Sequence, residues 1–108
     1  VLVNNAGCML HERQLDEDGL EANFATNTLG TYLLTTALLP RLEACQGRVV
    51  TVSSGGMLTQ PLSTDFNADN MKSNFDGTSV YALNKRQQVV MMERLALQVP
   101  AVFFASMH

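Results

Sequence analysis

The sequence predicts an α/β fold in which three short parallel strands alternate with two long helices. Three runs rich in apolar residues, at positions 1–3, 48–53 and 101–105, have the length and composition of strands. The segments between them are long enough for helical crossovers, and this alternation is typical of a parallel sheet with right-handed connections. We therefore expect a β-α-β-α-β unit, which is one half of a doubly wound parallel sheet.

The first crossover can be placed from local signals. The first strand, Val1–Val3, ends at the tight-turn sequence Asn4–Gly7. Asp16–Asp18 place carboxylates at the expected start of a helix, where they suit the positive end of its dipole. That helix should end close to Pro40. The next strand, Arg48–Ser53, is almost continuously apolar, which predicts a parallel strand buried on both faces.

The second connection contains a long polar stretch, residues 54–77. It is too long for an ordinary connection, so we expect either a functional loop or a lid. Thr78 or Ser79 can cap the following helix, which should end at about Gln98. Ala101–Ala105 then forms the last strand.

Length, charge and cysteine content limit the expected partners. The 108 residues suffice for one small domain at most. The net charge is −3 and no Lys/Arg cluster occurs, so we expect neither nucleic acid nor an anionic membrane surface as a partner. Cys8 and Cys45 match no metal-ligand or CxxC spacing. We therefore expect no metal site, and two reduced thiols in a reducing intracellular compartment.

The longest stretch without a charged residue, residues 22–40, raises the question of a membrane span. It contains Asn23, Asn27, Gly30 and five threonines, however. This polar content favours a helix that is buried on most sides over one that crosses a bilayer.

Tyr81 and Lys85 form the first candidate for chemistry. They are four residues apart on a predicted helix, so their side chains share one face. A phenol titrates near 10, too high for a proton shuttle at neutral pH, and an adjacent ammonium favours the phenolate. The pair could therefore act as an acid/base device, although the same spacing also occurs on many helices for packing and solvation alone.

Two further features are candidates for a functional role. Ser53–Gly56 follows a strand, where a hydroxyl could bond a substrate oxygen and glycine permits close approach, or where the chain simply turns. Asn27 lies in a mostly apolar helix and needs buried partners, and Gly30 costs about 1 kcal/mol there relative to Ala. The apolar context of Asn27 and the helical position of Gly30 both violate local rules, and such violations concentrate at functional sites. The alternative is that Asn27 caps a kink and Gly30 permits close helix packing.

Taken together, four motifs resemble those of the single-domain short-chain dehydrogenase/reductases. They are Asn4–Gly7 after a strand, Asn27–Gly30 in a helix, the serine strand Val52–Ser54, and Tyr-x-x-x-Lys at residues 81–85. Their order and placement match the family over essentially the whole chain. The resemblance implies a Rossmann-type fold and an enzyme that moves a hydride between a nicotinamide cofactor and an alcohol or carbonyl carbon.

Finer features resemble the retinol-dehydrogenase-like branch of that family. They are Asp18–Glu21, Asn27–Thr35 and the long insertion between Ser54 and Tyr81. Three more runs resemble one poorly characterised group within it: Val52–Met57, Phe75–Thr78 and Asn84–Gln88. The branch implies a lipophilic substrate, such as a retinoid, a steroid or a fatty aldehyde.

The resemblance also implies roles for individual residues. Tyr81 would donate or accept the proton of the substrate oxygen, and Lys85 would favour the phenolate and bond the nicotinamide ribose. Ser54 would hold the substrate oxygen; it is preferred to Ser53 because it aligns with the family's second serine. Asn27 would organise a water molecule that links Lys85 to solvent.

Cofactor binding is implied for Asn5, Ala6 and Gly7 as well as for Tyr81 and Lys85, with NADP favoured over NAD. The Gly-rich loop that cradles pyrophosphate is not found in the sequence, so residues 1–108 are expected to be a partial NAD(P)-binding domain, inactive alone. Family members often dimerise, and a homodimer is expected. The alternatives are a truncated, non-catalytic binding or dimerisation module and, ranked last, a sugar-nucleotide epimerase that shares Tyr-x-x-x-Lys.

Overall fold

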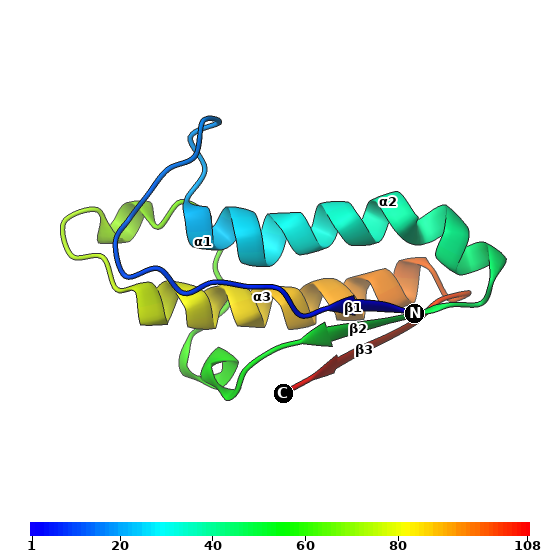
Figure 1. Cartoon of the computed structure of the whole chain (residues 1–108). Helices are drawn as coiled ribbons and strands as arrows, with labels where there is room; N and C mark the ends of the chain where they lie inside the picture. Colours follow the sequence, from blue (N-terminus) through cyan, green and yellow to red (C-terminus); the bar gives the residue numbers. More distant parts are fainter.

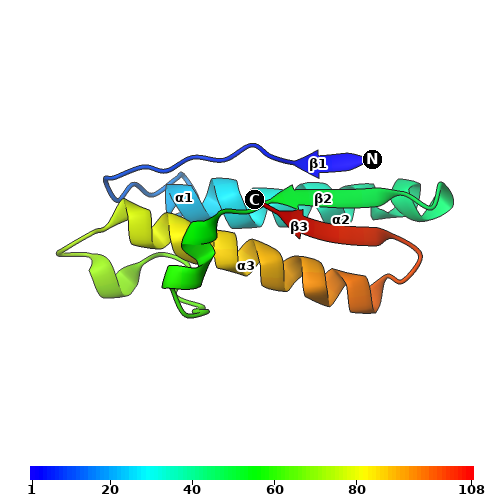
Figure 2. The ribbon, with the colours of Figure 1, turned by 90° about the horizontal axis from the view of Figure 1, so that it is seen from below.

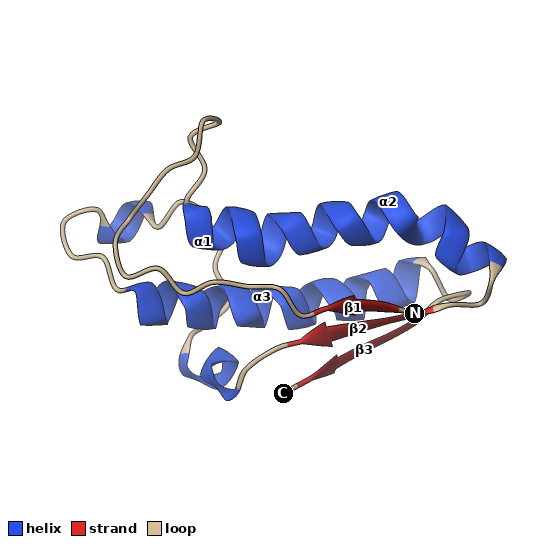
Figure 3. Cartoon of the chain, viewed as in Figure 1, coloured by secondary structure: helices blue, strands red, loops and turns tan.

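The structure is a computed structural model that describes all 108 residues. Its strands form one parallel sheet in the order β1 (Leu2–Asn4), β2 (Arg48–Val52), β3 (Phe103–Met107) (Figure 3). Leu2 pairs with Val49, which pairs in turn with Phe104. The parallel β-α-β-α-β unit is thus confirmed, with every strand end within two residues of its prediction.

Two helical segments cover one face of this sheet (Figures 1 and 2). The first is continuous and consists of α1 (Ala22–Phe24), the π-helix η1 (Ala25–Leu29) and α2 (Gly30–Ala44). The second is α3 (Gly77–Gln98), which ends where the sequence predicted. Both crossovers lie on the same side of the sheet, as two right-handed connections that progress in one direction across a sheet must.

The hydrophobic core lies between the sheet and these helices. It consists of Leu42 from α2, Val49 from β2, Met92 and Leu95 from α3, and Val102. The opposite face of the sheet is uncovered, because Val3 is 57% and Phe103 64% exposed. The apolar pattern of the second strand predicted burial on both faces; within this chain the helices supply cover for one face only.

The first helix begins later than its acidic residues predicted. Asp16 does not start a helix, because its carboxylate accepts the backbone N–H groups of Asp18 and Leu20 and closes a turn. Gly19 lies in that turn with a φ of 77°, a conformation that favours glycine. Glu21 caps the helix instead, accepting the N–H groups of Asn23 and Phe24.

The first helix also extends past Pro40 to Ala44. A proline in a helix leaves the carbonyl of the preceding turn without its N–H partner, and Pro40 is exposed, so water can satisfy that carbonyl. The expectation that this helix is buried on most sides is wrong. Within α2 only Thr31, Thr35 and Leu42 are buried, because a single stripe packs against the rest of the chain.

The helix α3 is capped by Asp76, and not by Thr78 or Ser79. The Asp76 carboxylate accepts hydrogen bonds from the Thr78 N–H (3.0 Å) and from the Ser79 hydroxyl (2.6 Å). At the other end, the N–H of Val102 donates to Val99 and forms a turn, so that β3 begins two residues later than predicted.

The long polar segment between β2 and α3 packs against residues 8–24. It contains the short 3-10 helices η2 (Gly55–Thr59) and η3 (Asp69–Met71). Phe66 stacks on Phe24 with the ring centroids 4.6 Å apart, and Arg13 forms a 3.2 Å ion pair with Asp69.

None of the helices combines the length with the apolar character needed to cross a bilayer.

Gly77→Ala is expected to lower the free energy of unfolding of the full-length protein by on the order of 1–3 kcal/mol. An added Cβ would lie inside contact distance of the Leu10 carbonyl and 2.9 Å from the His11 Cα, both of which are backbone atoms. Gly55→Ala is the matched control, since its Cβ would meet nothing within 4 Å. Urea denaturation measures both, and equal stability of the two variants would contradict the packing described here.

Candidate active site

A pocket of about 350 Å³ opens at the carboxyl ends of β1 and β2. In open parallel sheets this edge is where ligands bind. Its lining brings together four residues predicted for the site, namely Asn5, Gly7, Tyr81 and Lys85. The remaining lining residues are Cys8, Met9, Val52 and Ser53.

The helix α3 places Tyr81 and Lys85 on the same face of the pocket. The Lys85 Nζ lies 5.4 Å from the centroid of the Tyr81 ring, within the range of a cation–π contact. The close approach of Gly77 to Leu10 sets the first turn of this helix against the loop that follows β1.

Lys85 is a buried cation, only 3% exposed, without an acidic partner. Both ion pairs of the chain involve Asp69 and lie elsewhere. The Lys85 Nζ donates to the carbonyl of Val52 (2.8 Å), and the Ser53 hydroxyl donates to the carbonyl of Lys85 (3.1 Å). Burial without a compensating charge lowers the pKa of Lys85.

Asn27 lies fully buried in the π-helix, directly behind the pocket wall. Its Oδ1 accepts the N–H of Cys8 (2.9 Å), and its Nδ2 donates to the carbonyl of Cys8 (2.8 Å) and to Asn84 Oδ1 (3.2 Å). The neighbouring Gly7 permits this approach, because a Cβ there would lie 3.0 Å from Asn27 Oδ1. One amide thus holds the backbone that lines the pocket.

Gly30 has a local role in the same helical segment. Its N–H donates to the carbonyl of Ala25, the i−5 bond of a π-helix, and a Cβ on it would lie 3.2 Å from that carbonyl. The close contact of Gly30 is therefore with its own helix, and not with a packed neighbour.

The two serines differ in how their hydroxyls are used. Ser53 lines the pocket, but its hydroxyl is already engaged with Lys85 and Met57. The Ser54 Oγ accepts the N–H of Gly56 (3.2 Å) and caps η2, and its own proton is donated to no group in the chain. Neither Ser54 nor Ala6 belongs to the lining of this pocket.

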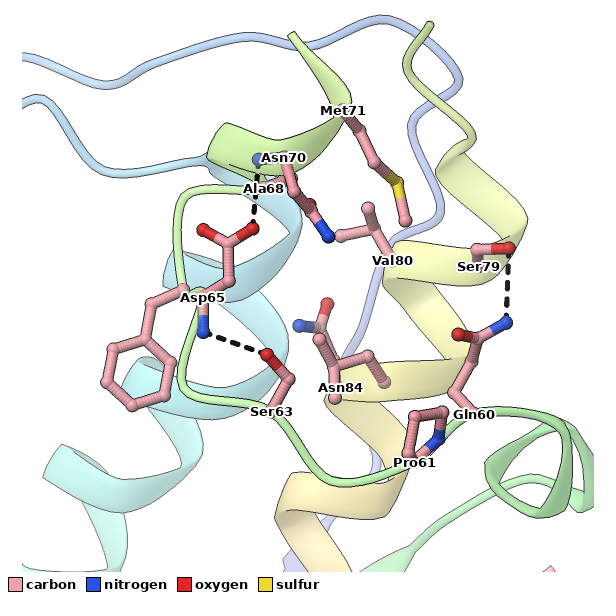
Figure 4. A pocket seen from close by; sticks show the side chains of 12 residues that line it. Gln60, Pro61, Ser63, Asp65, Ala68, Asn70, Met71, Ser79, Val80 and Asn84 are labelled. Carbon is pink, nitrogen blue, oxygen red and sulfur yellow. Dashed lines mark hydrogen bonds between the residues drawn. The ribbon is translucent and has the colours of Figure 1, made fainter.

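A second cavity, of about 210 Å³, lies between the polar segment and the opposite side of α3 (Figure 4). Val80 and Asn84 from α3 form one wall, and Pro61, Ser63 and Asp65 contribute to the facing wall. The Asp65 carboxylate is turned away to accept the N–H groups of Asp69 and Asn70.

Sequence reasoning missed the contacts that hold this site together. The polar side chains Asn84, Gln87 and Gln88 are all buried, and all bond to the π-helix. Their spacing of i, i+3 and i+4 on a long helix was a signal for one shared face. Cys8 and Met9 carried no comparable signal, because their place at the pocket depends on the backbone contact with Asn27.

Comparison with known proteins identifies the class. Residues 1–64 match the family model described as short chain dehydrogenase, so the chain belongs to the short-chain dehydrogenase family. That region contains Asn4–Gly7, Asn27 and Ser53–Ser54, and the family predicted from those motifs is confirmed.

Individual relatives show which members of the family the chain resembles. The chain is 62% identical over its whole length to dehydrogenase/reductase SDR family member 12 of Bos taurus and 61% identical to the protein of that name from Homo sapiens. It spans 34% of the length of each. The runs 52–57, 75–78 and 84–88 predicted a resemblance to this group, which is confirmed. Half of the chain is also 47% identical, over 55 residues, to 17% of retinol dehydrogenase 12 of Mus musculus.

A solved structure agrees with the predicted Rossmann-type fold. The alcohol dehydrogenase of the archaeon Thermococcus sibiricus, complexed with 5-hydroxy-NADP, matches with a TM-score of 0.66. The match covers 96% of this chain and 39% of that chain at 20% identity, which establishes the shared fold alone.

The donors at the pocket fit the sugar of a nicotinamide nucleotide. Lys85 has three N–H groups, of which one bonds to Val52, so two remain for oxygen acceptors such as ribose hydroxyls. The missing side chain at Gly7 leaves space beside them, since a Cβ there would lie 3.9 Å from Lys85 Nζ.

Lys85→Met is expected to raise the melting temperature of the full-length protein near pH 7, because it removes a buried charge. The folded state lowers the pKa of Lys85, so the full desolvation cost opposes folding below that folded-state pKa. The cost fades as the pH rises from there to the unfolded value of about 10.4. The advantage of the variant should therefore shrink toward pH 10.

Thermal denaturation at both pH values measures this difference. Lys72→Met is the control, because the Lys72 side chain is 62% exposed and should show little change. A Lys85→Met protein that is less stable than wild type near pH 7 would contradict the uncompensated burial of Lys85.

Proposed function

We propose that the protein transfers a hydride between a nicotinamide cofactor and an alcohol or carbonyl carbon, with Tyr81 as the general acid/base. The proposal depends chiefly on one observation, the buried and unpaired Lys85 ammonium beside the Tyr81 ring in a pocket at the strand ends. A buried cation without an acidic partner is costly, and such groups concentrate at functional sites.

In this mechanism Tyr81 moves the proton and Lys85 compensates the charge. Tyr81 is half-buried, so its hydroxyl can reach both the pocket and a substrate oxygen. When that proton leaves, the adjacent ammonium stabilises the negative charge, and the interaction is stronger because little water separates the two groups. The bound cofactor would supply the hydride chemistry, while the protein supplies position and proton transfer.

Ser54 and Asn27 have supporting roles in the proposal. Ser54 has a free hydroxyl proton and would donate it to the substrate oxygen. Asn27 Oδ1 and Lys85 Nζ face the same space beside Gly7. A Cβ on Gly7 would lie 3.0 Å from Asn27 Oδ1 and 3.9 Å from Lys85 Nζ. A water molecule in that space would link Lys85 to solvent.

We also propose which cofactor the protein binds, which class of substrate it converts and which oligomer it forms. Asn5, Ala6 and Gly7 would line the cofactor, which we take to be NADP or NAD with NADP favoured. A lipophilic alcohol or carbonyl is proposed as substrate, supported by the retinol dehydrogenase among the relatives. We also propose a homodimer, for which the exposed apolar side chains of Tyr32, Leu33 and Leu34 on α2 offer contact surface.

Tyr81→Phe is expected to lower turnover by about 10²–10⁴-fold in the full-length protein, the usual contribution of a positioned acid/base. Cofactor affinity should change little, because only one hydroxyl is removed. NAD(P)H absorbance with a panel of retinoid, steroid and fatty carbonyl substrates measures the rate, and fluorescence titration measures cofactor affinity.

The chain offers a matched control in its other tyrosine. Tyr32 is 45% exposed on α2, so Tyr32→Phe should retain full activity. If the Tyr81→Phe variant retained most of the wild-type rate, the proposed role of Tyr81 would be refuted.

A further inference from the structure

One side of α3 carries three buried uncharged polar residues that the proposed mechanism does not use. Asn84 is 2%, Gln87 6% and Gln88 1% exposed. Buried amides require hydrogen-bond partners, and an apolar side chain at such positions would carry no desolvation cost. We refer to Asn84, Gln87 and Gln88 as the stripe, and their hydrogen-bond partners indicate what it does.

All three amides bond to the π-helix η1. Asn84 Oδ1 accepts from Asn27 Nδ2 (3.2 Å), and Gln87 Oε1 accepts from the Thr28 hydroxyl (2.8 Å). Gln88 Nε2 donates to the main-chain carbonyl of Asn27. A π-helix leaves backbone groups out of the regular α-helical pattern, and here Gln88 supplies a partner for one of them, the carbonyl of Asn27.

Asn84 differs from the other two because it touches the amide that holds the pocket wall. The Asn27 Nδ2 has two protons, one bonded to the Cys8 carbonyl and the other to Asn84. Asn84 Oδ1 therefore adds to the Cys8 backbone groups in holding one orientation of the Asn27 amide, with Nδ2 toward the Cys8 carbonyl and Oδ1 toward the Cys8 N–H. The opposite orientation would place Oδ1 against two acceptors, the Cys8 carbonyl and Asn84 Oδ1, and Nδ2 against the Cys8 N–H, which is also a donor.

We propose that Asn84 is a positioning residue, which orients the Asn27 amide and thereby fixes the Gly7–Cys8 backbone against Lys85. The catalytic consequence rests on the proposed function, whereas the effect on the Cys8 backbone does not. Asn84 also lines the second cavity (Figure 4), and Gln87 Nε2 donates to the Ser63 carbonyl (3.1 Å). The stripe thus links the polar segment to the active-site wall.

Asn84→Leu tests this, since leucine has nearly the same shape and makes no hydrogen bond. The first measurement is independent of activity: the alkylation rate of Cys8 by iodoacetamide, followed by mass spectrometry on the full-length protein. Loss of one buried hydrogen bond predicts an increase of about fivefold. The exposed Cys45 is the internal reference and should react at an unchanged rate.

Thr28→Val is the matched control variant. It removes the 2.8 Å bond from Thr28 to Gln87 in the same buried stripe, but it leaves both contacts of Asn27 Nδ2 in place. Cys8 should then react at close to the wild-type rate. An equal increase of Cys8 alkylation in both variants, or no increase in Asn84→Leu, would overturn the proposal.

The second measurement is a double-mutant cycle on kcat. Asn84→Leu should lower kcat by between about tenfold and a hundredfold while the substrate KM stays close to wild type. In an Asn27→Ala background the same change should have almost no further effect, because Asn84 acts through Asn27. Independent, additive losses would show a merely structural role and overturn the proposal.

The two measurements separate the possible failures. An increase in Cys8 alkylation in a protein without dehydrogenase activity would refute the proposed function and leave the positioning role supported. Where Asn84→Leu does not fold, Asn84→Ala removes the same acceptor in a smaller side chain, and the same two outcomes decide.

Discussion

A reciprocal pair of hydrogen bonds holds α3 to the end of β2, and the geometry of the site depends on it. Lys85 donates to the Val52 carbonyl, and Ser53 donates back to the Lys85 carbonyl. Because Lys85 supplies both its side chain and its carbonyl, while the end of β2 supplies the Val52 carbonyl and the Ser53 hydroxyl, α3 can neither slide nor turn about its axis without breaking one of the two bonds. The ammonium is thereby kept at the strand ends, beside the Tyr81 ring, despite the cost of burying it.

Hydrogen bonds hold the elements together near the candidate active site, whereas apolar packing holds them together in the rest of the chain. The hydrophobic cluster of Leu42, Val49 and Leu95 lies between the sheet and the helices. Toward the strand ends the contacts become polar, with Asn27 and Asn84 in place of aliphatic residues. Hydrogen bonds demand direction as well as distance, so a satisfied polar network specifies one arrangement more narrowly than apolar contacts do.

The sequence predicted the features that depend on spacing and missed those that depend on tertiary contact. Strand alternation and the four-residue interval from Tyr81 to Lys85 are local patterns, and both gave the correct face and order. The helix start was misplaced because Asp16 and Glu21 are both plausible caps, and only the turn closed by Asp16 decides between them. The contact of Asn84 with Asn27 joins residues far apart in sequence, so no local pattern could show it.

The π-helix has a consequence for how this segment can change in evolution. Its hydrogen bonds run from residue i to i−5 in place of i−4, so it accommodates one extra residue, and each residue of an α-helix turns it by about 100°. Asn27 lies before the end of the π-helix and faces Cys8, whereas Thr35 lies after it and accepts a hydrogen bond from Asn4. Deleting one residue would rotate one of these side chains away from its partner. Substitutions can therefore accumulate here, but the number of residues between Asn27 and Thr35 is constrained, and the segment should tolerate no gap.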